Sequence, residues 1–565
     1  MKKVLSLALL ITFVISASAQ QWGMYTLYAT KNGTAGYLCD TNGTNYKTWT
    51  FSSSKKSAYS AYLIPGDTLV RSYKPTANTS WNSGGIHGGI QKLSWNGTAT
   101  WDFTYYGSTY CAHHDICPMP NGNILLISYE TKTSAEATQA GCSSATTLWA
   151  EKIVELKQTG PTTYTTVWEW HLWDHLCQNY NSAKDNYVTS IVNNPQLLNI
   201  NYGSGTDRWH MNGLDYNADL DQIAISMHFM NSVFIIDHST TTAEAADHTG
   251  GNSGKGGDFL YRWGNPASYS ASGTTVFQTI HDAHWISADH PLYPNYLCGF
   301  NNEGGTGGKS AVTIFNPPYN GYNYTQPAAG QAFAPAAYAY QYTSGFTATN
   351  ESNSQQLDNG NMLVNNAFGS VYEVNSAGTQ LWTKSTNSTH CYRYSLCYVR
   401  GPIASATASP TTVSAGSPVN LSSSAVSPTE TSPTYSYAWS SGDNTQNATV
   451  YPTGNTTYIV TITNTALGCS DTASVTVQVT TGVDDGLLNN ELTVYPNPTN
   501  GILNISNGLP QTDYTVSVFD QLGKVIIQEK NVIAVDLSQY KNGIYFLSVK
   551  TASKTYMTRK IILLK

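Results

Sequence analysis

Pro120-Asn121-Gly122-Asn123-Ile124-Leu125-Leu126-Ile127 joins a tight turn to a short apolar run, a pattern typical of a β-strand that follows a hairpin turn. The same unit of turn, apolar strand, second strand and aromatic-ended third strand recurs along the chain, at residues 120–170, 216–263, 296–315 and 358–382. Recurring short antiparallel sheets with variable insertions are typical of a β-propeller, whereas a sandwich does not need self-similar units. We therefore predict an all-β chain whose residues 20–402 form a propeller of about six blades.

The composition agrees with an exported all-β protein. Only 11% of the 565 residues are charged, tyrosine and glycine are abundant, and no long amphipathic helix pattern stands out. The net charge of −7 argues against nucleic acid as a partner, because binding a phosphate backbone requires a basic face. An anionic small substrate stays open, since only the local field at a site matters.

Residues 1–19 have the pattern of a secretory signal peptide. Lys2 and Lys3 precede an apolar run, and Ala17-Ser18-Ala19 supplies small residues for cleavage. The apolar run is too short to span a bilayer, and no later segment is a better candidate. We expect a soluble, exported mature protein with no stable membrane span.

The nine cysteines are an odd number, so at least one is unpaired or joined to another chain. Cys111 with Cys117, and Cys391 with Cys397, are close enough in sequence to form small loops and are candidate disulfides. Cys469 has no candidate partner in its own module. No Cys-x-x-Cys motif occurs, which disfavours a zinc ribbon or a thioredoxin-like site.

Residues 403–480 are rich in Ser, Thr, Pro and Val and carry short alternating strands such as 435–439 and 458–462. This pattern is similar to immunoglobulin-like sandwiches of the polycystic-kidney-disease type, with Trp439 in the core. We predict a spacer module here, followed by a linker at residues 481–490.

Residues 491–565 form a further compact β unit, predicted to be a small β-sandwich. Its motifs are Tyr495-Pro496-Asn497-Pro498, residues 542–546 and the terminal residues 560–565. Together they resemble the C-terminal sorting domain of the type IX secretion system. The resemblance implies that the type IX machinery exports the chain through the periplasm and outer membrane, as a secreted or cell-surface protein; such a signal is an address and says nothing about chemistry.

Residues 277–286 place two imidazoles, a carboxylate and two large aromatic side chains within ten residues. A neutral imidazole is a nucleophile or a proton carrier near neutral pH. His114 and His210 each lie seven residues before the asparagine of a turn, and His281 occupies the corresponding approach to the strand at residue 296. In a propeller these segments enter the innermost strands, so we predict that the three side chains converge. The alternative is a rim of unrelated histidines on surface loops.

Several longer motifs occur in order along the first domain: His113-His114-Asp115 with Pro118, residues 167–170 with Trp173-Asp174-His175, residues 209–217, Ser226-Met227-His228 leading to Asp237-His238, residues 256–266, and His281-Asp282-Ala283-His284-Trp285. With these motifs the domain resembles bacterial arylsulfate sulfotransferases. Those enzymes are six-bladed propellers that move a sulfuryl group between phenols without a nucleotide cofactor. The resemblance spans nearly all of residues 100–400.

The resemblance implies that His281 is the nucleophile that becomes transiently sulfated. It also assigns His114, His210 and the neighbouring Asn212 to the site. His228 stands where better-known members have an arginine, and a histidine carries a positive charge only when it is protonated.

Sulfuryl transfer, like phosphoryl transfer, depends on positioning and charge stabilisation, and a covalent intermediate gives ping-pong kinetics. His281 is predicted to attack sulfur in line with the departing phenolate. His210, Asn212, His228 and His114 are predicted to donate hydrogen bonds to sulfuryl oxygens, with His210 favoured to protonate the leaving phenol. The expected partners are small aromatic sulfate esters and phenols, and no cofactor or metal is expected.

The remaining polar residues of these motifs are predicted to support the site or only the fold. His113 is expected to orient its strand and His284 to support His281, while Asp115 and Asp282 either fix the orientation of an imidazole or only cap turns. His171 and His175 flank Trp173 and are interpreted as packing residues.

Two other functions are compatible with the sequence. One is a secreted, non-catalytic binding or adhesive propeller, which the histidine at position 228 makes conceivable. The other is a metal site in which several imidazoles face one channel, although neither a His-Glu-x-x-His motif nor close ligand spacing supports it.

Overall fold

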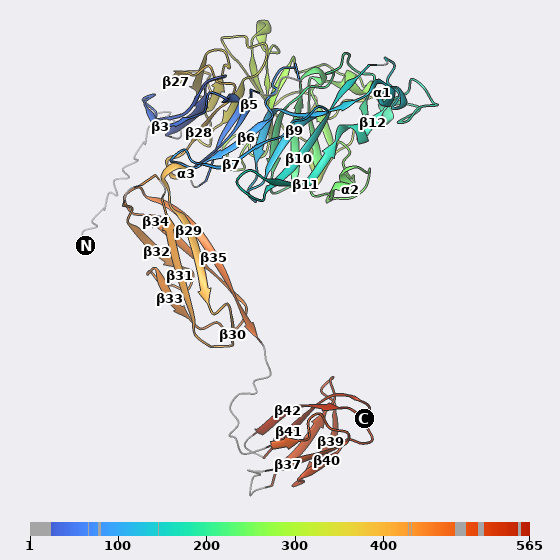
Figure 1. Cartoon of the computed structure of the whole chain (residues 1–565), viewed down its shortest axis with the longest axis vertical. Helices are drawn as coiled ribbons and strands as arrows, with labels where there is room; N and C mark the ends of the chain where they lie inside the picture. The colour runs from blue at the N-terminus through green and yellow to red at the C-terminus, as the bar shows by residue number, and fades with distance from the viewer. Residues whose placement is uncertain are drawn as a thin grey trace, which may run out of the picture. The chain divides into compact units, whose positions relative to one another are not determined.

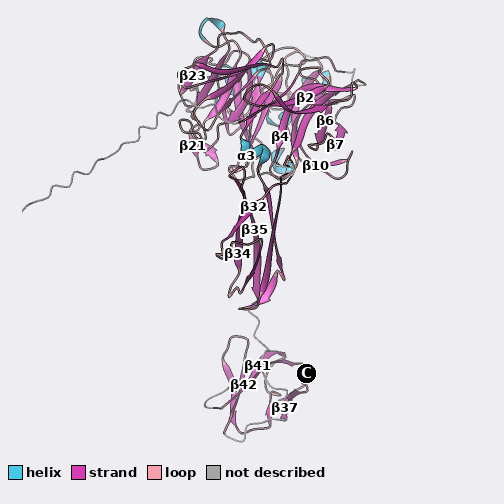
Figure 2. Cartoon of the chain, turned by 90° about the vertical axis from the view of Figure 1, so that its left-hand side faces the viewer, coloured by secondary structure: helices cyan, strands magenta, loops and turns pink. Residues whose placement is uncertain are grey.

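The computed structural model describes residues 24–480 and 493–565, except for residues 66, 77–80, 145, 428, 431, 507–512 and 552–554. The predicted signal peptide at residues 1–19 and the predicted linker at residues 481–490 lie outside the described residues. Strands dominate the chain and its helices are few and short (Figure 2). None of the helices among the described residues is long and apolar enough to cross a membrane.

Six four-stranded antiparallel sheets follow one another through the first domain, drawn in blue to yellow in Figure 1. In sheet order they are β28 (Cys391–Tyr394), β1 (Tyr25–Ala29), β2 (Ala35–Cys39) and β3 (Asn45–Thr50); β4 (Lys55–Ile64), β5 (Thr68–Pro75), β6 (Gly89–Leu93) and β7 (Ala99–Thr104); β8 (Tyr110–Pro118), β9 (Ile124–Lys132), β10 (Leu148–Gln158) and β11 (Tyr164–His171); β14 (Met211–Asn217), β15 (Gln222–Met227), β16 (Ser232–Asp237) and β17 (Tyr261–Trp263); β18 (Ile280–Trp285), β19 (Leu297–Asn301), β20 (Ala311–Phe315) and β23 (Tyr340–Thr343); β24 (Asn353–Gln356), β25 (Met362–Asn365), β26 (Ser370–Val374) and β27 (Gln380–Ser385).

The sheets form a closed ring. The first strand of each sheet contacts the first strand of the next, in the order β4, β8, β14, β18, β24 and β28. The ring closes because β28, from the end of the domain, pairs antiparallel with β1 from its start, with Cys391 opposite Tyr28 and Tyr394 opposite Tyr25. This arrangement confirms the predicted six-bladed propeller, with the first strands innermost.

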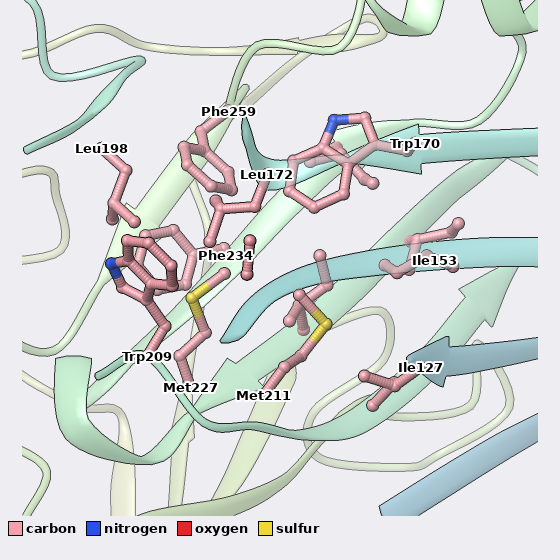
Figure 3. Packing of buried hydrophobic residues seen from close by; sticks show 14 of the residues in the cluster. Ile127, Ile153, Trp170, Leu172, Leu198, Trp209, Met211, Met227, Phe234 and Phe259 are labelled. Atoms are coloured by element: carbon pink, nitrogen blue, oxygen red, sulfur yellow. The ribbon is translucent and has the colours of Figure 1, made fainter. Parts of the chain in front are cut away.

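Apolar side chains fill the space between neighbouring blades. Between the β8–β11 and β14–β17 sheets, Trp170, Trp209 and Phe234 are fully buried and pack against Met211 and Met227 (Figure 3). Burying one large apolar side chain stabilises a fold by roughly 1.5–3 kcal/mol. Strands such as β15, β16 and β20 are buried along their whole length, because each blade packs between two neighbours.

Insertions between strands carry the remaining elements of the propeller. They comprise the helices α1 (Ser134–Gln139), α2 (Thr242–Ala245) and α3 (Leu396–Arg400), the 3-10 turns η1 (Leu172–His175), η2 (Ile191–Asn193), η3 (His228–Met230), η4 (Pro266–Tyr269) and η5 (Thr306–Gly308), and the short pairs β12 (Leu176–Cys177) with β13 (Leu198–Asn199) and β21 (Tyr319–Asn320) with β22 (Asn323–Tyr324). Both α1 and α2 begin with a capping box, in which the side chains of Thr133 and Thr241 bond Glu136 and Glu244 respectively.

Two sheets follow the propeller in sequence: β29 (Ile403–Ser409), β31 (Val419–Val426) and β33 (Asn447–Val450), and β30 (Thr412–Ser414), β35 (Cys469–Thr480), β34 (Thr456–Asn464) and β32 (Tyr435–Trp439). Trp439 is buried, as expected. The immunoglobulin-like assignment of this module and its boundaries stay predictions.

Both candidate disulfides are wrong. Cys397 pairs with Cys469, which has its partner outside its own module, at the end of the propeller segment. Cys111 and Cys117 are both buried and unbonded on the same strand, β8, opposite Tyr129 and Leu125 of β9; four residues of a strand span about 13 Å, too far for a bond between their sulfurs. Cys391 is buried in β28 between blades and takes part in no disulfide.

The C-terminal unit also contains two sheets: β36 (Thr493–Tyr495), β37 (Ile502–Ser506) and β40 (Ala534–Asp536), and β39 (Val525–Lys530), β38 (Thr515–Phe519), β41 (Gly543–Lys550) and β42 (Thr555–Leu563). They share one apolar core that includes Leu503, Val516 and Leu547.

Candidate active site

β-bulges in three innermost strands position the histidines. The pairing register shifts within β8, β14 and β18, and His114 (φ 51°), His210 (φ 55°) and Asp282 (φ 54°) adopt left-handed backbone conformations there. A left-handed conformation costs a residue other than glycine roughly 1–2 kcal/mol. Such residues and β-bulges occur at functional sites, where a bulge changes the direction of a side chain. The repeated position of the histidines in the sequence therefore corresponds to a repeated bulge in the structure.

Five imidazoles form one continuous series beside the bulges of the innermost strands. The ring centroids are 5.1 Å apart for His113 and His114, 4.6 Å for His114 and His210, 5.4 Å for His210 and His228, and 5.3 Å for His228 and His281. His228 joins the series because Met211 pairs with Met227, which sets the residues before and after this pair side by side. The structure thus brings together all the histidines predicted for the reaction.

Both ends of the series are buried, and its middle is accessible. The side chains of His281 and His114 are buried, whereas His210 and His228 are only partly buried. Phe229 is 48% exposed and contacts both of these rings, with centroid distances of 5.3 Å to His210 and 4.7 Å to His228. A ligand can therefore reach the series on the side of Phe229, where an aromatic surface is available.

His281 is held in one tautomer. Its Nδ1 lies 2.7 Å from Oδ1 of Asn302, whose amide nitrogen donates to the carbonyl oxygens of Ala348 and Glu351 and so fixes Oδ1 as the acceptor. Nδ1 therefore carries the proton and Nε2 carries a lone pair. That lone pair accepts a hydrogen bond of 3.1 Å from the backbone N–H of Glu351.

Burial sets the charge of His281 as well. Removal from water, followed by the neighbouring His228, lowers the pKa of His281 well below its ordinary value. A neutral imidazole that carries its lone pair on Nε2 is the form that attacks an electrophile.

Asp207 orients His210. Its Oδ2 atom accepts hydrogen bonds from Nδ1 of His210 (2.7 Å), the hydroxyl of Ser83 (2.7 Å) and the hydroxyl of Tyr129 (2.9 Å). Burial would raise the pKa of Asp207, but the hydrogen bonds from His210 and Ser83 outweigh burial and lower it. Asp207 is therefore an ionised acceptor that leaves the proton-accepting nitrogen of His210 at Nε2.

His228 is the member of the series with an unsatisfied atom. Its buried Nδ1 has no hydrogen-bond partner among the described residues. Leaving a buried polar atom unpaired costs about 1–3 kcal/mol of folding free energy. Burial, and then His210, lowers the pKa of His228 to about 4. At neutral pH this residue therefore offers an uncharged N–H or lone pair to a ligand and not the positive charge of an arginine.

His113 and His114 form a buried pair behind His210. Their Nδ1 atoms lie 2.8 Å apart, and Nε2 of His113 lies 3.0 Å from the carboxylate of Glu151, while the ring of His113 stacks on Tyr129. Burial lowers the pKa of both histidines well below the ordinary value and raises that of Glu151. This pair is uncharged at neutral pH and supports the more accessible rings.

Asn212 and Asp115 bind the backbone of neighbouring strands. The amide of Asn212 donates to the carbonyl of Ile280 (2.8 Å) and accepts from the hydroxyl of Ser226 (2.7 Å). The carboxylate of Asp115 accepts from the hydroxyl of Tyr62 (2.7 Å) and from backbone N–H groups, and burial raises its pKa. Both side chains therefore position the strands that carry His210, His114 and His281.

His284 and Asp282 connect the fifth blade to the sixth. Asp282 accepts a hydrogen bond of 2.8 Å from the backbone N–H of Ser354, and Nε2 of His284 lies 2.6 Å from the side-chain carbonyl of Gln356. Burial lowers the pKa of His284, but the nearby Asp282 carboxylate outweighs burial and raises it well above the ordinary value. His284 is accordingly a charged structural residue that fixes β18, the strand of His281.

Asp207 and Asn302, whose side chains hydrogen-bond His210 and His281, were not predicted from the sequence. Asp207 lies three residues before His210, a spacing that could have suggested a carboxylate partner. Asn302 lies 21 residues after His281 and approaches it only because Ile280 pairs with Asn301 in the β18–β19 hairpin. No sequence pattern signals that contact.

The fold and these contacts define a class of protein: a six-bladed propeller with a buried series of imidazoles on its bulged innermost strands. Residues 16–394, more than half of the chain, match the family model of the arylsulfotransferases. The chain belongs to the arylsulfotransferase family, and this membership implies a sulfotransferase.

Residues 493–564 match a secretion-system C-terminal sorting domain. This match confirms the resemblance to the type IX sorting domain and indicates export, to the cell surface or beyond it. A comparison with curated proteins gives no match.

Solved structures match this chain only at low similarity. The periplasmic gluconolactonase of Pseudomonas aeruginosa is 11% identical, with 66% of this chain and 99% of that chain covered and a TM-score of 0.36. BamB from Moraxella catarrhalis is 12% identical, with 65% and 87% covered and a TM-score of 0.26. Neither similarity bears on the chemistry of this chain.

Proposed function

We propose that this chain transfers a sulfuryl group from a phenolic sulfate ester to a phenol acceptor through a sulfohistidine at His281, without a nucleotide cofactor. The family membership supports the reaction class. The observation that carries the mechanism is the tautomer of His281, whose Nδ1–H is bound by Asn302 so that Nε2 holds the lone pair.

In the first half-reaction, Nε2 of His281 forms a bond to sulfur while the bond from sulfur to the phenolic oxygen breaks. The departing oxygen takes the electron pair and receives a proton from His210. In the second half-reaction, Nε2 of His210 takes a proton from the acceptor phenol, the phenolic oxygen bonds to sulfur, and the bond from sulfur to nitrogen breaks. Asp207 keeps His210 oriented and stabilises its doubly protonated form, which donates the proton from Nε2 in the first half-reaction and is regenerated in the second; between the two steps Nε2 is the neutral acceptor.

Charge on the sulfuryl oxygens is stabilised by donors beside His281. His228 supplies an uncharged donor in place of the arginine of better-known members, because its pKa is about 4. The backbone N–H of Glu351 points at Nε2 of His281, where it can donate to a sulfuryl oxygen once sulfur occupies that position. Asn212 is engaged with Ile280 and Ser226, so we assign it to positioning and not to direct contact with the sulfuryl group.

The reaction is tested by incubating the protein with nitrophenyl sulfate and phenol. We expect release of nitrophenol, formation of phenyl sulfate, and the parallel-line initial-rate pattern of a ping-pong mechanism. Saturable binding of the aryl sulfate without product would instead indicate the non-catalytic binding propeller and refute the proposal.

Replacing Asn302 with leucine should lower kcat by about a hundredfold, because His281 then loses the acceptor that fixes its tautomer. Asn302→Asp keeps an acceptor for Nδ1–H and should recover a substantial part of this loss. Kinetics of both variants with nitrophenyl sulfate, together with their melting temperatures, provide the test. Equal losses of kcat in both variants at matched stability would contradict a role in tautomer selection.

The activity should persist to unusually low pH. The mechanism requires neutral His281, and burial lowers the pKa of His281 well below its ordinary value and that of His228 to about 4. Because a base with a lowered pKa stays deprotonated down to that lower pH, kcat/KM for nitrophenyl sulfate should be similar at pH 7 and pH 5. A good leaving group removes the need for acid catalysis and isolates this effect. An acidic limb centred near pH 6.5 would contradict the assignment.

A further inference from the structure

A second group of ligand-type side chains lies outside the imidazole series. Nδ1 of His175, at the end of η1, is 2.8 Å from Oδ1 of Asp258, and Nδ1 of His248 is 2.7 Å from the same oxygen. The three ligand atoms lie within 4.8 Å of one another. His248 and Asp258 both belong to the segment between α2 and β17, so η1 and this segment meet at one carboxylate.

The hydrogen bonds of His175 indicate what the group is suited to bind. Its Nε2 lies 2.8 Å from the carbonyl oxygen of Ala245, which can only accept, so Nε2 carries a proton. In the neutral ring Nδ1 then presents a lone pair towards Asp258. A histidine whose distal N–H is bound by a backbone carbonyl and whose other nitrogen faces a carboxylate has the orientation of a metal ligand.

We propose that His175, His248 and Asp258 bind one divalent transition-metal ion of the zinc class. Two neutral imidazole nitrogens and one carboxylate oxygen are ligands of the type that Zn²⁺ prefers, at about 2.0–2.2 Å. Around a tetrahedral ion all three separations would be about 3.3 Å, so the two nitrogen–oxygen distances have to open by about 0.5 Å while the two nitrogens stay within reach of one ion.

The site is open on one side. His248 and Asp258 line a cavity of about 460 Å³ together with Lys255 and Asn193. His175 is fully buried and stacks on Trp170, whereas the side chain of His248 is 55% exposed. An ion can therefore enter past His248, and its fourth position faces the cavity. The ammonium group of Lys255 in that cavity favours water or an anion as the fourth ligand over a second cation.

The sequence pattern alone assigned His175 to packing against Trp173. The proposal does not depend on sulfuryl transfer, since none of the three residues belongs to the imidazole series. A bound ion would cross-link η1 to the segment that leads into β17.

Metal-free, untagged full-length protein titrated with Zn²⁺ provides the test, by calorimetry and by elemental analysis after dialysis. Wild type should bind one equivalent of Zn²⁺. In His248→Ala and in Asp258→Asn this equivalent should be absent or bound at least about a hundredfold more weakly. Zn²⁺ should raise the melting temperature of wild type more than that of either variant. His248 is largely exposed, so its alanine variant is expected to fold.

His171→Ala is the matched control, because His171 is a partly exposed histidine on β11 that bonds Glu130 and lies outside the group. It should bind as much Zn²⁺ as wild type. Comparison of the variants with wild type also separates this site from ions bound by the imidazole series. Unchanged stoichiometry and affinity in His248→Ala and Asp258→Asn, or no bound Zn²⁺ in wild type, would overturn the proposal.

Discussion

Replacing His281 with alanine should abolish sulfuryl transfer, with kcat/KM for nitrophenyl sulfate reduced by at least about a thousandfold. The variant loses the nitrogen that forms the bond to sulfur, whose lone pair is fixed on Nε2 by the contact of Nδ1–H with Asn302. Initial rates of nitrophenol release in the presence of phenol measure the effect.

Two controls make this loss interpretable. His281→Gln retains more side-chain volume than alanine in a buried position and should be equally inactive, which separates chemistry from packing. His171→Ala, on the outer strand β11, should retain wild-type activity. Full transfer by either His281 variant would show that the nucleophile is another group.

Replacing His210 with alanine should have the second largest effect, and its size should depend on the leaving group. With phenyl sulfate, whose phenolate is a poor leaving group, loss of the proton donor should lower kcat by about 10²–10⁴-fold. With nitrophenyl sulfate the first half-reaction should be affected far less, because nitrophenolate departs without protonation. Pre-steady-state release of the two phenols measures this difference.

The orientation of His210 by Asp207 gives an internal check. Asp207→Asn leaves the ring in place but removes the ionised acceptor of Nδ1, so it should show the same leaving-group dependence with a smaller amplitude. An equal loss with both donors in His210→Ala would indicate that His210 binds substrate and does not transfer the proton.

The parts of the site that were predictable are those fixed by local chain geometry. His114 and His210 each lie seven residues before the asparagine of a turn. The structure places each of them in or next to a bulge of an innermost strand. The strand pattern that predicted the propeller depends on the same repetition, in which a turn is followed by a short apolar strand.

The unpredicted parts depend on contacts between distant segments. Asn302 and Glu351 reach His281 from the residue after β19 and from the loop before β24, and neither has a pattern that specifies this approach. The same holds for Cys397 and Cys469, which are separated by 72 residues and were not considered as a pair. Asn212 was expected to contact substrate, yet it bonds a backbone carbonyl, since an amide buried between strands must satisfy its own donors.

Mass spectrometry of protein quenched after brief exposure to an aryl sulfate tests the central claim most directly. The account predicts a single sulfuryl adduct on the peptide that contains His281, which disappears on addition of phenol and is absent from His281→Ala. An adduct on any other residue, or turnover of the donor with no covalent adduct at any time, would contradict it.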